Sequence, residues 1–526
     1  MNWNHGTHGL LISYAASVAT LLCGLLFGRA PAARVLLSPL IAIPVLIVAA
    51  ILWTALAGLL KATGISVNVI PYLGLIFIAL FSGVAGLLFA RVPEKKSHKR
   101  GTLLEAVIPK PARGISKPNG LTLAGQPVPE SDETKHFKMI GTTGTGKSTA
   151  IRELLTGALE RGDRAVIADP DGSYLKRFYD PHRGDQILNP FDSRAARWNL
   201  FGEMANAHDA DQLARALIAE ADGDEGPWRN YARVLLSSLL RQLQRVRHDD
   251  VGELYRLIST TAVDDLREVL ADTPAASYLS QDNGRFFSAI RAVAITHLSA
   301  LEHVALQSSG DSLSVRSWIR AGRGVLFLPY RANEIATLRS IISTWMRLAI
   351  YETMSNGDSQ PEGEGQRLWF AIDELDALGQ IDGLKDALAR LRKFGGRCIL
   401  GLQSIAQVSG TYGRAQAQTI VENCGNTLIL RCSASEGGGT AHFASSLIGE
   451  REIIREQITK SRGEGVILAH DRRSISTSFQ HVTESAVLAS EIEQLPDLQG
   501  FLKFASQPEW KKITLTIPSN SLASGD

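Results

Sequence analysis

A phosphate-binding loop constrains the fold of this chain most, because residues 141–148 read GTTGTGKS and match the pattern G-x-x-x-x-G-K-[ST] completely. Such a loop works between a strand and a helix. A short apolar run precedes it at Phe137–Ile140, and apolar positions recur after it with helical spacing at Ile151, Leu154, Leu155, Ala158 and Leu159. The helix is expected to stop at Gly162, before a second apolar strand at residues 165–168. The sequence therefore predicts an α/β nucleotide-binding fold.

The composition of the loop predicts how a nucleotide is held. Glycines let consecutive backbone N–H groups surround a phosphate without Cβ clashes. Lys147 can reach the β- and γ-phosphates, and the Ser148 hydroxyl can bind Mg²⁺. ATP with Mg²⁺ is the expected ligand pair, and the predicted nucleotide-binding residues are Gly141, Thr142, Thr143, Gly144, Thr145, Gly146, Lys147, Ser148 and Thr149.

A second acidic motif follows another buried-strand pattern. Leu368–Ile372 is a continuous apolar run that ends in Asp373 and Glu374, the arrangement of a Walker B motif. Asp373 is predicted to hold Mg²⁺, and Glu374 to orient and deprotonate the attacking water. The next predicted strand, residues 398–402, ends in Gln403, an amide at the position from which RecA-like motors sense the γ-phosphate.

A basic cluster lies between these two strands and comprises Arg390, Arg392, Lys393 and Arg397, the first three on a helix expected over about Leu384–Phe394. An arginine from a neighbouring subunit can neutralise transition-state charge in phosphoryl transfer. Residue type and spacing leave this arginine finger open among Arg390, Arg392 and Arg397. A solvated basic helix face is the alternative.

Three long apolar stretches open the chain, at about Leu10–Phe27, Val35–Leu60 and Val69–Ala90. Each is near or above the roughly 20 residues that a helix needs to cross a bilayer. The first stretch is short and carries several hydroxyl side chains, so both two and three spans stay open. A cleaved signal peptide is disfavoured, because Met1–Gly9 contains no Lys or Arg.

The basic residues around these stretches predict their orientation. Before Arg91 the chain has only three Lys or Arg residues, and a dense basic group follows the third stretch; the residues are Arg29, Arg34 and Lys61, then Arg91, Lys95, Lys96, Lys99 and Arg100. By the positive-inside rule, three spans place the N-terminus outside and residues from 91 onward in the cytoplasm. Over the whole chain 55 Lys and Arg nearly balance 53 Asp and Glu, so net charge gives no argument for nucleic acid.

The remaining patterns divide the chain. The four domains expected are a transmembrane region at 1–90, a linker and first part of the nucleotide-binding domain at 91–198, an all-α domain at 199–304, and the second part of the nucleotide-binding domain with a short polar tail at 305–526. The linker includes a predicted β-hairpin near Leu121–Val128. Helical stripes dominate the third region, one of them made of Leu235, Leu239, Leu243 and Val246.

The C-terminal region is expected to complete the nucleotide-binding domain. It is predicted to contain a glycine-rich turn at 437–439, a helix around Gly449–Thr459, and strands at 465–469 and 501–505. The tail from Pro518 is short and polar, so it gives no support for docking a partner. The four cysteines lack C-x-x-C or zinc spacing, and a reduced chain without disulfides is predicted.

Taken together, these segments resemble the type IV coupling proteins of bacterial conjugation, the TrwB and TraD kind. The resemblance runs from about residue 91 to the early 430s. Besides the phosphate loop, the segments that carry it are ADPDGSYLKRFY at 168–179, ILNPFDSRAARWNLF at 187–201, FAIDELDALG at 370–379 and GLQS at 401–404.

The resemblance implies a RecA-like P-loop ATPase with an inserted all-α domain and N-terminal transmembrane helices. It also implies a homo-hexameric ring that hands relaxase-bound single-stranded DNA to a secretion channel. Within that family pattern Lys147 and Ser148 match the phosphate-loop pair, Asp373 and Glu374 the Walker B pair, and Gln403 the third motif. Arg392 best matches the arginine finger by its spacing after Glu374. The family usually has two membrane spans.

The implied function is a multi-pass ATPase of the bacterial inner membrane with its ATPase domain in the cytoplasm. It would couple the relaxosome to inner-membrane components of a type IV secretion channel and pump single-stranded DNA. One alternative is a membrane docking scaffold gated by ATP, in which other ATPases move the substrate. Another is a double-strand DNA translocase of the segregation type, which predicts a winged-helix domain after the motor.

Overall fold

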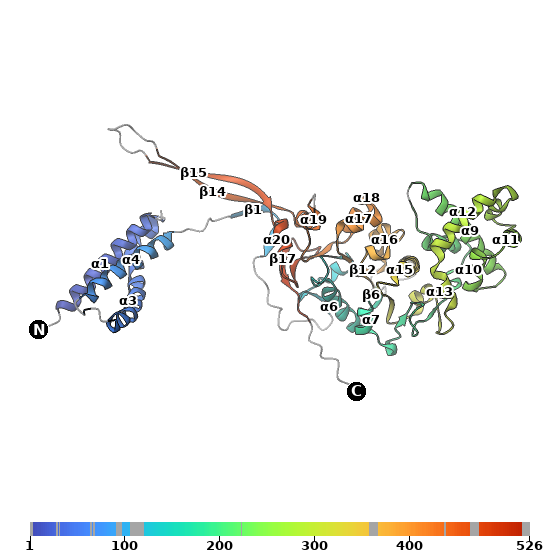
Figure 1. The fold of residues 1–526 in the computed structure, drawn as a ribbon, viewed down its shortest axis with the longest axis horizontal. Helices are drawn as coiled ribbons and strands as arrows, with labels where there is room; N and C mark the ends of the chain where they lie inside the picture. The colour runs from blue at the N-terminus through green and yellow to red at the C-terminus, as the bar shows by residue number, and fades with distance from the viewer. Residues whose placement is uncertain are drawn as a thin grey trace. The chain divides into compact units, whose positions relative to one another are not determined.

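The computed structural model describes residues 4–27, 30, 32–63, 66, 69–90, 97–105, 120–221, 223–356, 367–435, 438–462 and 473–517. The chain divides into two compact units (Figure 1). The first comprises residues 1–99 and 453–482, and the second comprises residues 100–452 and 483–526. Each unit is described by itself below.

The first unit begins with a group of helices, α1 (Asn4–Phe27), α2 (Ala32–Leu36), α3 (Ser38–Ala62) and α4 (Ile70–Ala90). Among the described residues of this region three helices are long and apolar enough to cross a membrane, which matches the three apolar stretches of the sequence. Helices α1 and α4 pack along each other, and Ser17 and Ser82 share a buried hydrogen bond of 2.8 Å there. Several residues that predicted the orientation, including Arg29, Arg91, Lys95 and Lys96, lie outside the described residues.

A three-stranded sheet is formed by β1 (Ser97–Gly101), β14 (Glu450–Arg462) and β15 (Arg473–Ser485), in the order β1-β14-β15. The helix expected around Gly449–Thr459 is therefore wrong. Gly449, with φ of +96°, instead ends the preceding helix α19 (Gly439–Ile448), and the chain leaves it as a strand. Pairing with β15, including an ion pair between Arg451 and Glu484 of 2.9 Å, overrides the local helical pattern.

The second unit is built on a ten-stranded sheet with the order β2-β17-β16-β13-β5-β12-β11-β6-β10-β7. The seven strands from β13 to β7 run parallel, as expected for an α/β fold. The strands are β2 (Leu103–Glu105), β5 (Phe137–Ile140), β6 (Arg164–Pro170), β7 (Gln186–Ile187), β10 (Val325–Tyr330), β11 (Leu368–Ile372), β12 (Gly396–Leu402), β13 (Asn426–Ile429), β16 (Gln499–Lys503) and β17 (Glu509–Thr514). The predicted strands at 137–140, 165–168, 368–372 and 398–402 are confirmed.

Both faces of this sheet are covered, because successive side chains of a strand point to opposite faces. On one face Met139, Ile167 and Trp369 pack with helix α6 (Lys147–Glu160) and with the hairpin of β3 (Thr122–Leu123) and β4 (Gln126–Pro127). On the other face Val166 and Phe370 belong to a larger core that includes helix α15 (Ile335–Asn356). The predicted hairpin and the predicted helix after the phosphate loop are confirmed.

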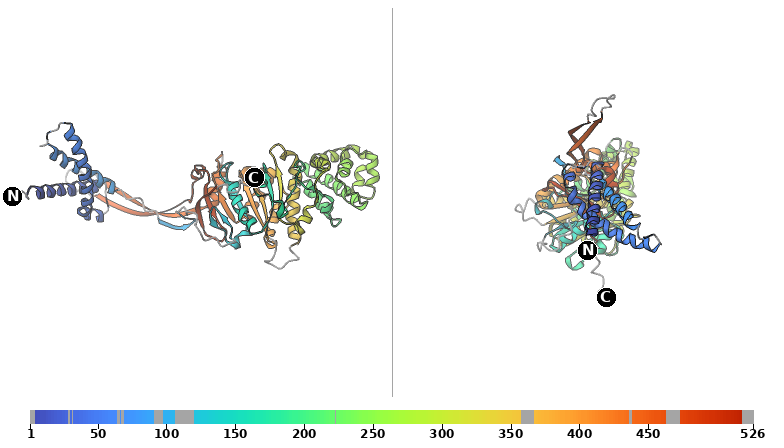
Figure 2. Two further views of the ribbon diagram at one scale, coloured as in Figure 1. Left: turned by 90° about the horizontal axis from the view of Figure 1, so that it is seen from below. Right: turned by 90° about the vertical axis from the view of Figure 1, so that its left-hand side faces the viewer.

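Helices dominate the segment between β8 (Arg197–Trp198) and β9 (Ser312–Leu313). They are α8 (Asp209–Leu217), α9 (Glu225–Arg245), α10 (Val251–Ser259), α11 (Val263–Val269), α12 (Gly284–Leu298) and α13 (Ala300–Leu306). Helices α9–α13, drawn in green, gather at one end of this unit, beyond the sheet (Figures 1 and 2). Leu235, Leu239 and Leu243 are buried as expected, but Val246 is 65% exposed because α9 ends at Arg245.

The remaining elements are short or lie near the strand ends. They are α5 (Glu130–Glu133), α7 (Ser173–Phe178), α14 (Val315–Ala321), α16 (Leu384–Leu391), α17 (Ile405–Tyr412), α18 (Arg414–Asn423), α20 (Ala489–Glu493) and 3-10 turns at Pro181–Arg183, Phe201–Glu203, Pro274–Leu279, Gln281–Asn283, Asp376–Leu378 and Arg392–Phe394. The predicted strand at 465–469, the position of Gly437 and the tail from Pro518 lie outside the described residues. The expected strand at 501–505 corresponds to β16.

Candidate nucleotide-binding site

The phosphate loop connects β5 to α6. Gly144 and Gly146 have positive φ angles of 79° and 115°. A Cβ atom on Gly146 would lie 2.9 Å from side-chain atoms of both Leu498 and Leu515. Space and backbone conformation therefore both require glycine at this position.

Distant segments hold the loop through its backbone. The Gly141 N–H donates to the carbonyl of Leu402, the last residue of β12, at 3.1 Å. The Leu498 N–H, just before β16, donates to the carbonyl of Thr145 at 2.9 Å. The C-terminal region thus supports the loop directly, and sequence reasoning had not identified Leu498. Its only sequence signal is an ordinary apolar residue near a turn.

Lys147 is buried at the first position of α6. Its Nζ donates to the carbonyls of Gly141 at 2.6 Å and Thr142 at 3.1 Å. Burial lowers the pKa of Lys147, while the charges of Asp373 and Glu374 act in the opposite direction. The ammonium group therefore lies at the loop with two carboxylates close enough to act on it.

Ser148 and Asp373 are brought together from α6 and the end of β11. The Ser148 hydroxyl donates to Asp373 Oδ2 at 2.6 Å. Tyr174, on α7, donates its hydroxyl to the same oxygen at 2.8 Å. A hydroxyl that donates its proton to a carboxylate keeps lone pairs on its oxygen for a cation. Thr149 follows in the first turn of α6.

A second hydrogen-bonded chain links the loop to Glu374. The Thr143 hydroxyl donates to Gln403 Oε1 at 3.2 Å, and Gln403 Nε2 donates to Glu374 Oε1. Burial raises the pKa of Glu374, and the charges of Asp373 and Asp376 raise it further. These side-chain hydrogen bonds connect Glu374 and Gln403, which follow β11 and β12, to the phosphate loop.

The basic cluster separates into two environments. Arg390 and Arg392 are exposed, at the end of α16 and in the turn after it. Arg397 lies within β12, is buried, and pairs with Glu133 at 3.1 Å. Its guanidinium also donates to the carbonyl of Gly395. These groups belong to the same chain, so the Arg397 guanidinium is engaged within it, whereas the side chains of Arg390 and Arg392 are exposed.

The donors present fit a magnesium nucleotide. No group of three or more His, Cys, Asp or Glu side chains that could hold a metal occurs in the described part of the chain. Mg²⁺ needs no such group, since it is usually held by one or two protein ligands, phosphate oxygens and waters. The buried polar atoms that lack a hydrogen-bond partner in the described structure include Asp376 Oδ1 and the Tyr330 hydroxyl, and both belong to residues whose electrostatic interactions reach Glu374. A polar ligand or its water shell suits this environment.

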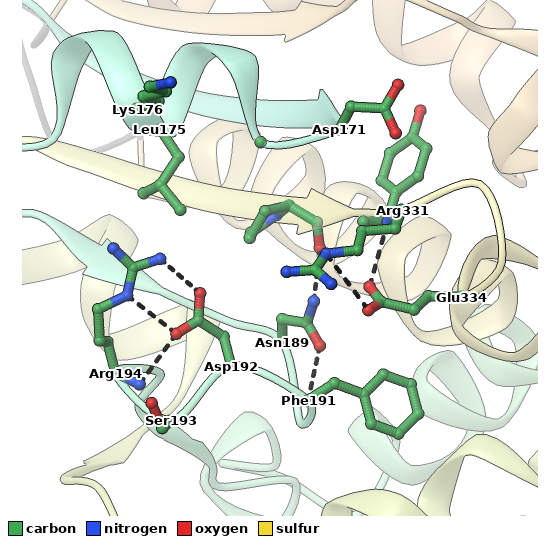
Figure 3. Close-up of a pocket in the computed structure, with 13 residues that line it drawn as sticks. Asp171, Leu175, Lys176, Asn189, Phe191, Asp192, Ser193, Arg194, Arg331 and Glu334 are labelled. Atoms are coloured by element: carbon green, nitrogen blue, oxygen red, sulfur yellow. Dashed lines mark hydrogen bonds and ion pairs between the residues drawn. The ribbon is translucent and has the colours of Figure 1, made fainter.

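A polar cleft of about 510 Å³ lies at the ends of β6 and β10 (Figure 3), and Tyr330, which interacts with Glu374, is part of its lining. It is lined by Asp171, Gly172, Leu175, Lys176, Asn189, Phe191, Asp192, Ser193, Arg194, Pro329, Tyr330, Arg331 and Glu334, so it contains none of the predicted nucleotide-binding residues. Arg194 pairs with Asp192 at 2.7 Å. The Arg331 N–H donates to Glu334 Oε2 at 3.1 Å, and Arg331 Nε lies 3.9 Å from Glu334 Oε1. Its lining contains three basic and three acidic side chains, so their formal charges cancel.

Sequence reasoning also missed Tyr174, although it lies within a segment that carried the resemblance. Helical spacing predicts that such a residue is buried, but not that its hydroxyl reaches Asp373, 199 positions later in the chain. Only the parallel pairing of β6 with β11 brings the two segments together.

The sheet order, the phosphate loop and the acidic strand end define a RecA-like P-loop nucleotide-binding protein with an inserted helical segment. Residues 120–516 match the family described as the type IV secretion-system coupling protein DNA-binding domain. The chain therefore belongs to the type IV coupling protein family.

Curated relatives include the coupling protein TraD of Escherichia coli (strain K12), which is 30% identical over 405 residues, 76% of this chain and 55% of TraD. A conjugal transfer protein TraG of Escherichia coli is 23% identical over 406 residues, 69% of this chain and 62% of TraG. The chain thus spans 55% and 62% of the length of these two relatives.

Solved structures of the plasmid coupling protein TrwB share the fold. The unbound monoclinic form of TrwBdeltaN70 is 33% identical with a TM-score of 0.70, over 81% of this chain and 95% of that one. TrwB in complex with ADP and Mg²⁺ is 32% identical with a TM-score of 0.69, over 81% of this chain and 96% of that one. The predicted fold class is confirmed by these likenesses.

Proposed function

We propose that this chain is an ATPase that binds ATP with Mg²⁺ at the phosphate loop and uses its hydrolysis to move single-stranded DNA. The observation that carries the proposal is the hydrogen bond of Ser148 to Asp373 beside the Thr143–Gln403–Glu374 chain. These contacts bring the residues of both nucleotide motifs to one place. The TrwB complexes with ADP and Mg²⁺ and with a non-hydrolysable ATP analogue support the choice of ligand.

In this proposal residues 141–149 surround the phosphates, and Lys147 turns its ammonium group from the loop carbonyls to the β- and γ-phosphates. Ser148 and Asp373 are the residues that would hold the cation. The cation supplies charge neutralisation on the phosphate oxygens when it is bound. Glu374, with its raised pKa, accepts a proton from the attacking water while Gln403 fixes the orientation of its carboxylate.

The arginine finger in this proposal is Arg392, contributed by a neighbouring subunit of a homo-hexameric ring. Arg390 is the alternative, since both side chains are exposed near the end of α16. A finger supplied between subunits makes turnover depend on assembly. Steady-state ATPase activity that rises steeply with protein concentration supports this part of the proposal, and concentration-independent turnover argues against it.

We also propose that helices α1, α3 and α4 anchor the protein in the bacterial inner membrane, with the second unit in the cytoplasm. Their length and apolar composition support this location. By its family, the chain would dock a relaxase bound to single-stranded DNA and pass it to inner-membrane components of a type IV secretion channel. The proposal also keeps the four domains predicted from the sequence, with boundaries after residues 90, 198 and 304.

The test is steady-state ATPase activity and plasmid transfer with the full-length protein. Lys147→Ala is expected to lower turnover about 100-fold or more, since it removes a charge that stabilises the transition state. Turnover of the wild type is expected to rise when single-stranded DNA is added. Undiminished transfer by Lys147→Ala would overturn the proposal.

Glu374→Gln separates a motor from a docking scaffold. This variant keeps the size of the side chain and the position of Gln403, but it cannot accept the proton of the attacking water. A motor is expected to bind ATP and fail to transfer DNA. Normal transfer by a variant that binds ATP without hydrolysing it would identify a docking scaffold instead.

A further inference from the structure

The Walker B carboxylate receives two hydrogen bonds on one oxygen. Ser148 donates to Asp373 Oδ2 from α6 at 2.6 Å, and Tyr174 donates to it from α7 at 2.8 Å. Ser148 is already assigned to the cation, whereas Tyr174 has no assigned role. Because Ser148 and Tyr174 donate to Asp373 Oδ2 from two different helices, they restrict rotation of the Asp373 carboxylate. The other oxygen, Oδ1, therefore keeps a fixed direction.

Tyr174 is itself held firmly. It is 1% exposed, and its backbone N–H donates to Asp169 Oδ1 at 3.0 Å. The Leu175 N–H donates to the other oxygen of Asp169 at 2.6 Å. Asp169 thus fixes the start of α7 directly after β6, where Asp171 turns the chain with a φ of +58°.

The ring of Tyr174 also contacts the helix that carries the phosphate loop serine. The Arg152 guanidinium lies 5.6 Å from the centre of this ring. Ser148 and Arg152 are four residues apart on α6 and therefore share one face of that helix. The same face of α6 holds Asp373 through Ser148 and Tyr174 through Arg152.

We propose that Tyr174 is a positioning residue for the metal ion, because its hydroxyl fixes the Asp373 carboxylate in the orientation that receives Mg²⁺ with the nucleotide. The inference rests on the proposed function. Groups that orient a metal ligand by hydrogen bonding commonly change metal affinity by about 10- to 100-fold when they are removed. In this proposal Tyr174 acts through its hydrogen bond to Asp373 rather than by contact with the nucleotide.

The experiment is a titration of full-length protein with a fluorescent ADP analogue, at graded Mg²⁺ concentrations and without Mg²⁺. Tyr174→Phe removes the hydroxyl and keeps the ring against Arg152. It is expected to raise the Mg²⁺ concentration needed for half-maximal binding about tenfold. Binding of the analogue without Mg²⁺ is expected to stay as in the wild type. Excess Mg²⁺ is expected to restore wild-type turnover.

Tyr412→Phe is the matched control. Tyr412 is also buried, and its hydroxyl accepts one hydrogen bond, from the Ile381 N–H at 3.2 Å, away from Asp373. Both variants are expected to lower the melting temperature, but only Tyr174→Phe changes the Mg²⁺ dependence. If Tyr174→Phe leaves the Mg²⁺ dependence unchanged, or weakens binding equally with and without Mg²⁺, the role of Tyr174 is overturned while the proposed function stands. A wild-type protein without Mg²⁺-dependent nucleotide binding would overturn the proposed function as well.

Discussion

The N-terminal helices and the nucleotide-binding unit differ in how many of their large apolar side chains are exposed. Glycines bring α1 and α4 into close contact, Leu21 and Leu25 are buried in this helical group, and other large apolar side chains such as Leu10, Phe27 and Leu80 are exposed. A Cβ atom on Gly24 would lie 2.3 Å from the carbonyl oxygen of Gly83, so the two backbones touch. In the nucleotide-binding unit the large side chains lie inside, and Trp345, Trp369 and Phe370 are among the largest that are fully buried.

Different forces hold the two regions together. In water, burial of apolar area stabilises a core, so large side chains gain most when they are inside. Between helices surrounded by lipid that force is absent, and close packing and hydrogen bonds remain. The buried Ser17–Ser82 hydrogen bond and the glycines of α1 and α4 fit the second case.

Removing a large side chain from the core of the nucleotide-binding unit should change the free energy of unfolding most. Trp345, on α15, is 1% exposed and packs edge-on against Trp198 with ring centres 5.6 Å apart. Trp345→Ala is expected to lower the free energy of unfolding of this unit by roughly 4 kcal/mol, because it removes apolar contacts and leaves a cavity. Urea unfolding followed by far-UV circular dichroism measures the change.

Trp345→Phe is the control for this prediction. The Trp345 indole N–H is buried without a hydrogen-bond partner in the described structure, so its removal offsets part of the lost packing. A smaller loss than for alanine is therefore expected. Equal losses for the two variants would contradict the argument that apolar volume dominates this core.

A buried histidine makes the nucleotide-binding unit sensitive to acid, whereas the buried serines of α1 and α4 do not titrate. The Cys398 N–H donates to His136 Nδ1 at 3.0 Å, and His136 Nε2 is 2.9 Å from the Leu388 carbonyl, so the neutral ring with its proton on Nε2 satisfies both groups. Burial lowers the pKa of His136 from 6.5 to about 4.

The sign of the pH effect follows from this shift. Below pH 6.5 the unfolded chain takes up a proton that the folded chain excludes until about pH 4, so stability falls as the pH is lowered through that range. The loss is expected to reach roughly 3 kcal/mol, at about 1.4 kcal/mol for each pKa unit. Urea unfolding at pH 7, 5.5 and 4.5 measures it. His136→Gln should reduce the slope, and an unchanged slope would assign the effect to other groups.

These contacts also separate what the sequence could predict from what it could not. The phosphate loop, β11 and β12 follow from patterns within about ten consecutive residues, and the structure has them at the expected positions. The pairing of Arg397 with Glu133 and of Tyr174 with Asp373 joins residues far apart in the chain. Such contacts depend on the order of strands in the sheet, which local periodicity does not contain.

The helix expected around Gly449–Thr459 failed for the same reason. Residues 450–462 have the local composition of an exposed helix, but β14 gains its hydrogen bonds from β15 and β1. Gly449 is a local sequence signal against this helix, because glycine commonly ends a helix. In the structure it follows the last residue of α19 and has a positive φ. Conversely, the roles of Lys147, Glu374, Gln403 and Arg392 stay predictions, because geometry brings groups together without measuring their chemistry.

Enlarging a small residue should disrupt the helical pair, the reverse of the effect at Trp345. A Cβ atom on Gly86 would lie 2.5 Å from the Leu21 carbonyl oxygen. Gly86→Leu is expected to separate α1 from α4 at a cost of roughly 1–3 kcal/mol. Cysteines at positions 17 and 82, whose serine oxygens are 2.8 Å apart, should then form less disulfide in membranes. Gly58→Leu, on α3 with open space at its Cβ, is the control.

The smallest effect is expected from the hydrogen bond between the helices. Ser17→Ala removes one partner of the buried Ser17–Ser82 pair. Hydrogen bonds between helices in lipid are worth about 0.6 kcal/mol on average, because the separated helices find other partners. Amide exchange of α1 in micelles should therefore quicken about threefold, a ratio that follows from that free energy. Ser13→Ala, at a half-buried position of the same helix, should leave exchange unchanged. A loss as large as that of Gly86→Leu would mean that the hydroxyls, rather than close backbone packing, hold these helices together.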